Sequence, residues 1–188
     1  MMPADPAHVR AVAVDLLREH LAQDGHLRFD VIGACMSPLI DVGDQVELQA
    51  VSVARLHVGD ILLFDDSGEF YTHRLLARPD YHNGTWFLQT RGDRSPWRDR
   101  PWEANQLVGQ VVAVYKPDGG RIDLTVGYWP LLNRTLGTLS RWEAALLVRG
   151  MAVRRRLFGT RSTPVAPWAQ AVLTAPGRLL ASLLARFR

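Results

Sequence analysis

The chain has 188 residues, of which 47% are hydrophobic, 22% are charged and 9% are aromatic. These proportions are typical of a folded domain with a hydrophobic core, and they exclude a wholly disordered chain. The formal net charge of +3 is unevenly distributed. Residues 1–120 contain 11 basic and 17 acidic residues (−6), whereas residues 121–188 contain 11 basic and 2 acidic residues (+9). An acidic body therefore precedes a basic C-terminal part.

The composition also bears on the cellular compartment. Cys35 is the single cysteine, so no intrachain disulfide can form and nothing requires an oxidising environment. The first residues lack the basic region and apolar run of a secretory signal, and no uncharged apolar stretch reaches the roughly 18 residues of a membrane-spanning helix. We therefore expect a cytoplasmic protein, with peripheral attachment to a membrane as an additional option.

The first region, residues 1–28, has the pattern of an amphipathic helix. Asp5 is a suitable N-cap, and Pro6 suits the first helical position. Apolar residues then recur at spacings of three and four as far as Leu21, and Gly25 marks the end of the helix.

The second region, residues 29–125, has the pattern of a β domain, in which short apolar or alternating segments are separated by turn residues. Asn83-Gly84 is a hairpin signal because both residues tolerate a positive φ. Val42-Gly43-Asp44 and Val58-Gly59-Asp60 each precede a strand, and we interpret them as two similar turns. The expected strands lie at residues 29–32, 46–53, 61–64, 70–76, 85–90, 108–115 and 121–125.

The third region, residues 126–188, is a basic tail rich in leucine and arginine. Its patterns predict amphipathic helices at residues 141–158 and 177–188, with a linker near residues 159–167. Basic amphipathic helices can lie on anionic lipid surfaces, although such a helix can also pack on the β domain with its arginines in solvent. We do not expect nucleic-acid binding, because no recognisable nucleic-acid module accompanies these charges.

Cys35 is the first candidate for chemistry. It lies in the segment Gly33-Ala34-Cys35-Met36-Ser37-Pro38, between the start of the β region and a turn. A lone cysteine is more often a small buried hydrophobe than a nucleophile. A nucleophile at a strand end, beside backbone N–H groups, is nevertheless what acyl transfer requires, provided that a base or a positive charge favours the thiolate.

His73 is the best candidate among six histidines for that base, because the pattern places it within a strand. The loop of residues 91–99 supplies Asp93 and Asp99, and a carboxylate can orient a histidine and stabilise its imidazolium. The alternatives are a satisfied core histidine, and aspartates that pair with neighbouring arginines. Cysteine and histidine spacing indicates no metal site, and no glycine-rich phosphate loop is present, so we expect no metal or cofactor.

The order of these segments resembles the signal peptidase I and LexA-type serine peptidase superfamily. Residues 33–44 resemble its nucleophile box, Gly-x-Ser-Met-x-Pro followed by a Gly-Asp turn, and residues 59–64 resemble the strand that comes next. Residues 91–93 are similar to the Lys-Gly-Asp box, and residues 109–112 are similar to the closing Gly-x-Val strand. The resemblance covers residues 29–125 and implies a mainly β, signal-peptidase-like domain.

The pair His73-Arg74 resembles that of the endoplasmic-reticulum and archaeal branch, in which histidine replaces the bacterial lysine base, and Asp99 falls at the second aspartate of that branch. The chain departs from the family at the nucleophile, where Cys35 replaces serine. The single lysine, Lys116, lies near the end of the matched region, which excludes a Ser–Lys dyad. The membrane-spanning anchor of the family has no counterpart in the match.

The resemblance implies a cysteine peptidase that removes a leader or signal segment from a precursor peptide or protein. Cys35 would be the nucleophile and His73 the general base, with Asp93 and Asp99 holding His73. Substrate contacts are implied at four residues of the nucleophile box, namely Gly33, Met36, Ser37 and Pro38.

Three alternatives to this peptidase stay open. The first is an inactive peptide-binding domain of the same fold, and the second is a membrane-surface adaptor that acts through the basic tail. A self-cleaving LexA-type repressor is disfavoured, because about 28 residues before the nucleophile box are too few for a helix-turn-helix domain.

Overall fold

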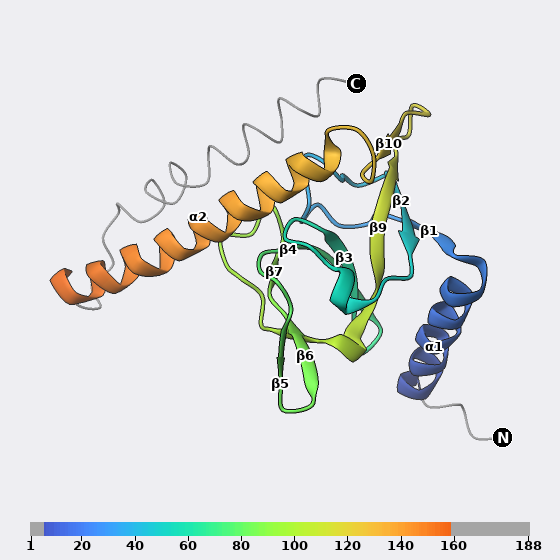
Figure 1. Ribbon diagram of the computed structural model, residues 1–188, viewed down its shortest axis with the longest axis horizontal. Helices are drawn as coiled ribbons and strands as arrows, with labels where there is room; N and C mark the ends of the chain where they lie inside the picture. The colour runs from blue at the N-terminus through green and yellow to red at the C-terminus, as the bar shows by residue number, and fades with distance from the viewer. Residues whose placement is uncertain (1–5, 159–188) are drawn as a thin grey trace.

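The computed structural model describes residues 6–158 of the chain. Within these residues, ten antiparallel strands form two sheets, with helix α1 beside one end of the larger sheet and the long helix α2 crossing the domain (Figure 1). The larger sheet has the order β1-β2-β9-β3-β4-β7, and β10 adds to β9. The smaller sheet has the order β5-β6-β8. The chain is therefore mainly β, as the sequence predicts.

The elements have the following bounds. The helices are α1 (Pro6–Asp24), α2 (Trp129–Phe158) and the 3-10 helices η1 (Val53–Arg55) and η2 (Ala104–Gln106). The strands are β1 (His26–Asp30), β2 (Gln45–Gln49), β3 (Ile61–Asp66), β4 (Glu69–Leu75), β5 (Asp80–His82), β6 (Thr85–Leu88), β7 (Thr90–Arg91), β8 (Trp102–Glu103), β9 (Leu107–Tyr115) and β10 (Arg121–Asp123).

Two local predictions are confirmed in detail. Helix α1 stops at Asp24, and Gly25 follows it with a φ of 78°. Asn83 and Gly84 both have positive φ values, of 52° and 83°, and form the tight turn of a hairpin. The strand before this turn is β5, however, and not the segment of residues 70–76. The sequence misses β5 because its three residues are all exposed.

The two Val-Gly-Asp segments form the same kind of turn. Gly43 and Gly59 have φ values of 92° and 98°, in the left-handed region that favours glycine. The carboxylate of Asp44 accepts the N–H of Asp41 at 2.8 Å, and that of Asp60 accepts the N–H of His57 at the same distance. The predicted similarity of the two turns is confirmed down to their hydrogen bonds.

Strand β3 separates two hydrophobic clusters, which explains its uninterrupted apolar sequence. Ile61 and Leu63 point to one side, where they join residues of β2, β9 and α1, and Leu62 and Phe64 point to the other. The first cluster consists of Leu21, Met36, Leu39, Ile40, Val46, Leu48, Ile61, Leu63, Val108, Val111, Val114 and Leu124. The second consists of Leu56, Leu62, Phe64, Leu75, Leu88 and Trp102.

Helix α2 begins at Trp129, well before the predicted start at residue 141. Pro130 is tolerated in the first turn of a helix, and one face of α2 is buried as far as Leu147. That face consists of Asn133, Leu136, Ser140, Ala144 and Leu147. The predicted helix at residues 177–188 and the linker at 159–167 lie outside the described residues. Neither described helix is long and apolar enough to cross a membrane.

Glycines allow α2 to approach the turn at Gly59. A Cβ atom on Gly137 would lie 2.7 Å from the Cα of Gly59, and a Cβ on Gly59 would lie 2.1 Å from the carbonyl oxygen of Asn133. Neither position has room for a side chain, so the contact is backbone against backbone. Gly150, on the same helix, has no atom within 4 Å of its hypothetical Cβ.

This contrast gives a matched pair of substitutions. We expect Gly137→Ala to lower the free energy of unfolding by about 1–3 kcal/mol, because α2 must move away from the turn. Gly150→Ala should raise it by about 1 kcal/mol, because alanine is the better helix former. Urea unfolding of both variants measures the difference, and equal effects would contradict the close approach of α2 to Gly59.

Candidate active site

Cys35 lies in the turn that follows β1, between strand β4 and the loop of residues 92–99. Its side chain is partly buried, and its Sγ lies 3.4 Å from the carbonyl oxygen of Thr72 on β4. Its own carbonyl accepts the N–H of Arg94 at 2.9 Å. The described residues provide no backbone acceptor for the N–H of Cys35. The thiol and a free backbone donor therefore lie at the same position.

His73 on β4 lies between Cys35 and Asp99. Its side chain is 12% exposed, and its Nδ1 lies 2.6 Å from Oδ2 of Asp99. Burial by itself would lower the pKa of His73, but hydrogen bonds and electrostatic attraction to Asp99 and Cys35 raise it to about 9. These contacts therefore favour the charged form of the imidazole at neutral pH, beside the thiol of Cys35.

Asp99 is held in place by residues that sequence reasoning does not find. Thr90 donates its hydroxyl to Oδ2 of Asp99 at 2.6 Å, and the side chain of Gln89 donates to the Asp99 carbonyl at 2.7 Å. The indole of Trp102 in turn donates to the Thr90 hydroxyl at 2.8 Å. Thr90 and Gln89 carry no sequence signal for this role, because the contact depends on how the loop after β7 folds back.

Asp93 does not take part in holding His73. Both of its carboxylate oxygens accept hydrogen bonds from the guanidinium of Arg74, at 2.8 and 2.7 Å. Successive residues of a strand point to opposite faces, so Arg74 and its partner lie on the face away from His73. The prediction that both aspartates hold His73 is therefore corrected: Asp99 does so, and Asp93 neutralises a buried arginine.

The nucleophile box contributes less to a substrate surface than the sequence predicts. Met36 is 1% exposed and packs in the first hydrophobic cluster, so its predicted substrate contact is wrong. Ser37 donates its hydroxyl to Asp41 at 3.2 Å, and the Ser37–Pro38 peptide bond is cis. Gly33 is exposed with open space around it. Gly33, Ser37 and Pro38 therefore stay available at the surface.

Lys116 stabilises the segment that follows Cys35 through a buried ion pair and a hydrogen bond. Its ammonium group is buried, pairs with the carboxylate of Asp44 and donates to the Leu39 carbonyl at 2.8 Å. Both partners lie within the few residues that follow Pro38. The single lysine thus has a structural role, in agreement with a histidine base.

Gly92 allows the imidazole and the Cys35 turn to come together. A Cβ atom on Gly92 would lie 3.0 Å from Nε2 of His73 and 3.1 Å from the Cys35 carbonyl oxygen. Those separations are closer than ordinary contacts, so only glycine fits without displacing one of the two groups. The packing of the loop against His73 thus depends on glycine at position 92.

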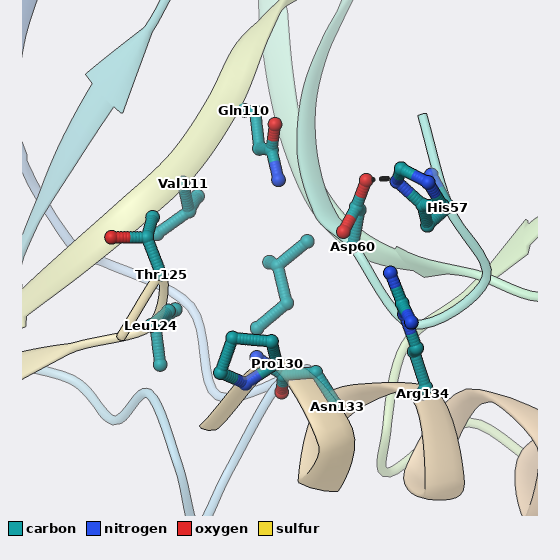
Figure 2. Close-up of a pocket in the computed structure, with 10 residues that line it drawn as sticks. His57, Asp60, Gln110, Val111, Leu124, Thr125, Pro130, Asn133 and Arg134 are labelled. Atoms are coloured by element: carbon teal, nitrogen blue, oxygen red, sulfur yellow. Dashed lines mark hydrogen bonds between the residues drawn. The ribbon is translucent and has the colours of Figure 1, made fainter. Parts of the chain in front are cut away.

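A separate recess of about 160 Å³ lies between the start of β3, β9 and the first turns of α2 (Figure 2). Asp60, Gln110 and Arg134 are among the residues around it. Burial raises the pKa of Asp60, against the opposing effects of the His57 N–H and the nearby positive charges. None of the predicted catalytic residues lines this recess. Within residues 6–158, no group of three or more metal-ligating side chains could hold a metal ion.

Comparison of the chain with known proteins gives no further identification. No protein-family model matches it, and no curated protein has significant sequence similarity to it. The chemistry of the site must therefore be argued from its own residues.

The two aspartates can be separated by matched substitutions. Asp99→Asn removes the carboxylate from His73, so we expect the pKa of the imidazole to fall from about 9, because burial is then opposed only by the contact with Cys35. Asp93→Asn removes the partner of a buried charge and should lower the free energy of unfolding by about 3–5 kcal/mol. NMR titration of His73 and urea unfolding distinguish these effects. The assignment fails if Asp93→Asn shifts the His73 titration as far as Asp99→Asn does.

The raised pKa of His73 also predicts how stability depends on pH. Because the folded value of about 9 lies above the ordinary value of 6.5, the folded state binds the proton more tightly than the unfolded chain. The stabilisation is complete below pH 6.5 and is lost as the pH rises through 9; its upper bound is about 3 kcal/mol. Urea unfolding of the native chain and His73→Gln between pH 5.5 and 9.5 measures it. Parallel stability curves for the two proteins would contradict this prediction.

Proposed function

We propose that the protein is a cysteine peptidase of the signal-peptidase-like kind, which removes a leader or signal segment from a precursor peptide. The observation that carries this proposal is the alignment of Cys35, His73 and Asp99, whose contacts favour the charged form of the imidazole. A thiolate beside an imidazolium is an effective nucleophile, and a carboxylate on the other imidazole nitrogen keeps the ring oriented.

The proposed reaction proceeds through a thioester. The thiolate of Cys35 attacks the carbonyl carbon of the scissile peptide bond, and the oxyanion accepts a hydrogen bond from the free N–H of Cys35. As the C–N bond breaks, His73 gives its proton to the leaving amine. Water then attacks the thioester and passes a proton to His73, and the C–S bond breaks to release the acid and the thiolate. Asp99 remains ionised throughout and stabilises the charged form of His73.

The edge of β4 offers a place for an extended substrate. Strand β4 pairs with β3 along its length, but with β7 only at Arg74 and Leu75. The same edge is therefore open at residues 69–72, next to the Cys35 thiol. An extended peptide can add to an open strand edge through main-chain hydrogen bonds. This arrangement supports a peptide as the substrate class and brings its backbone within reach of Cys35.

The order of the elements supports the signal-peptidase-like fold as part of the same proposal. The segment that resembles the nucleophile box forms the turn at Cys35, and residues 59–64 form a turn and β3. Residues 91–93 lead from β7 into the loop that reaches Asp99, and residues 109–112 lie in β9, next to β3. Each segment thus contributes to one site or to the sheet that carries it.

The first test is the rate at which iodoacetamide alkylates Cys35, measured across pH. A thiolate–imidazolium pair reacts rapidly already at pH 6–7, and His73→Ala should lower that rate about tenfold or more. His57→Ala is the matched control, because His57 lies in the separate recess and should leave the rate unchanged. An ordinary thiol that is indifferent to His73 would exclude the activated nucleophile.

The second test is cleavage of a proteome-derived peptide library, with new N-termini identified by mass spectrometry. The native chain should produce cleavage at a restricted set of sequences, and Cys35→Ala should produce none while retaining the fold. If Cys35→Ala and the native chain both bind peptides without cleavage, the chain is the inactive peptide-binding domain. Cleavage that persists in Cys35→Ala would refute the assigned nucleophile.

A further inference from the structure

The outer face of α2 carries apolar side chains that nothing in the described chain covers. Leu131 is 71% exposed and Trp142 is 59% exposed, and Leu146 and Val153 are also exposed. Their spacings of 11, 4 and 7 residues place them on one face of an α-helix, opposite the buried face. Such large apolar side chains in a row are unusual on a surface that meets only water.

The same face is positively charged. Helix α2 contains six arginines and one acidic residue, Glu143, which pairs with the buried Arg91. Arg149 and Arg156 are exposed and lie on the same side of the helix as the apolar residues by helical spacing, whereas Arg134 faces the recess beside Asp60. The outer face therefore combines an apolar stripe with positive charge that no acid on the helix offsets.

The inner face of α2 is occupied by contacts with the β domain. Asn133 accepts a hydrogen bond from Arg74, and Ser140 and Glu143 hold Arg91. The C-terminal part of α2 extends past the sheets, where residues 148–153 are all exposed (Figure 1). The helix is thus fixed to the domain on one side and presents its other side outwards from the described part of the chain.

We propose that the outer face of α2 docks on an anionic lipid membrane. Guanidinium groups bind lipid phosphates, and Trp142 beside aliphatic residues suits the boundary between headgroups and acyl chains. Charge alone would also fit a nucleic acid, but the apolar stripe would then have no partner. The fit of both properties favours lipid. Docking of this face leaves the contacts with Arg74 and Arg91 intact, so it needs no change at the site of Cys35.

The test is co-sedimentation of the full chain with vesicles of phosphatidylcholine alone or mixed with phosphatidylglycerol. We expect binding to the anionic vesicles only, with a loss in 0.5 M salt. The double variant Arg149→Glu/Arg156→Glu should lose at least about tenfold in affinity for the anionic vesicles. Trp142→Ala/Leu146→Ala should also weaken binding, because the apolar stripe is shortened.

The matched control is Arg55→Glu/Arg78→Glu, which makes the same charge change at exposed arginines outside α2 and should bind as the native chain does. Circular dichroism and the Cys35 alkylation rate show whether each variant keeps its fold. Three results would overturn the proposal: equal weakening in the control, binding to neutral vesicles, and no binding to any vesicle. No binding would mean that something else, such as residues 159–188 or a second copy of the chain, occupies this face. Binding to duplex DNA in place of vesicles would also overturn the proposal. Vesicle binding does not depend on peptidase activity, so the two proposals fail independently.

Discussion

Arg74 is fully buried, and its guanidinium joins three segments that are far apart in the sequence. It donates to the Gly59 carbonyl at 3.0 Å, to the side chain of Asn133 on α2 at 2.8 Å and to both oxygens of Asp93. A buried charge is costly unless it is paired and fully hydrogen-bonded, and here each contact also fixes a separate part of the fold. Its neighbour His73 points to the opposite face. One strand therefore carries structural electrostatics on one face and the candidate chemistry on the other.

Arg91 repeats this arrangement at the next strand. It donates to the carbonyl oxygens of Ser95 and Ser140 and pairs with Glu143 at 3.0 Å. The other Glu143 oxygen is buried and has no partner among the described residues, so this ion pair is less completely satisfied than that of Arg74. Together the two arginines hold the loop of residues 92–99 against α2. Asp99 ends this loop and reaches His73. The first half of α2, although read as a tail in the sequence, is thus part of the support of the site.

The sequence predicted correctly those turns and strands that depend on the properties of a few neighbouring residues. Asn83-Gly84 predicted a turn correctly, because the backbone there requires positive φ values that these two residue types tolerate. The apolar run at residues 61–64 predicted a strand correctly, because that strand is buried on both sides. Residue type and position, together with a resemblance to a family's motifs, predicted Cys35, His73 and Asp99 as site residues, and the structure brings these three side chains together. The partner of each aspartate could not be read from the sequence, because both follow one strand and the path of the loop decides which reaches His73. The predicted substrate contact of Met36 was wrong for a similar reason. The motif gives the position of the residue in the sequence, but packing in the first hydrophobic cluster decides where its side chain points.

The surroundings of His73 suit a cysteine at position 35 better than a serine. A serine hydroxyl needs a neutral imidazole to take its proton, whereas the contacts around His73 favour the charged form up to a pH of about 9. Part of that preference comes from Cys35 itself, but the Asp99 carboxylate supplies its own share and is oriented by Thr90. An imidazolium is a poor base for an alcohol and a good counterion for a thiolate. The carbonyl of Thr72 opposes formation of the thiolate, because it accepts a hydrogen bond from the thiol, with 3.4 Å between Sγ and the carbonyl oxygen. In the proposed function, a peptide at the open edge of β4 would lie next to this carbonyl, so its binding would favour release of the thiol from Thr72.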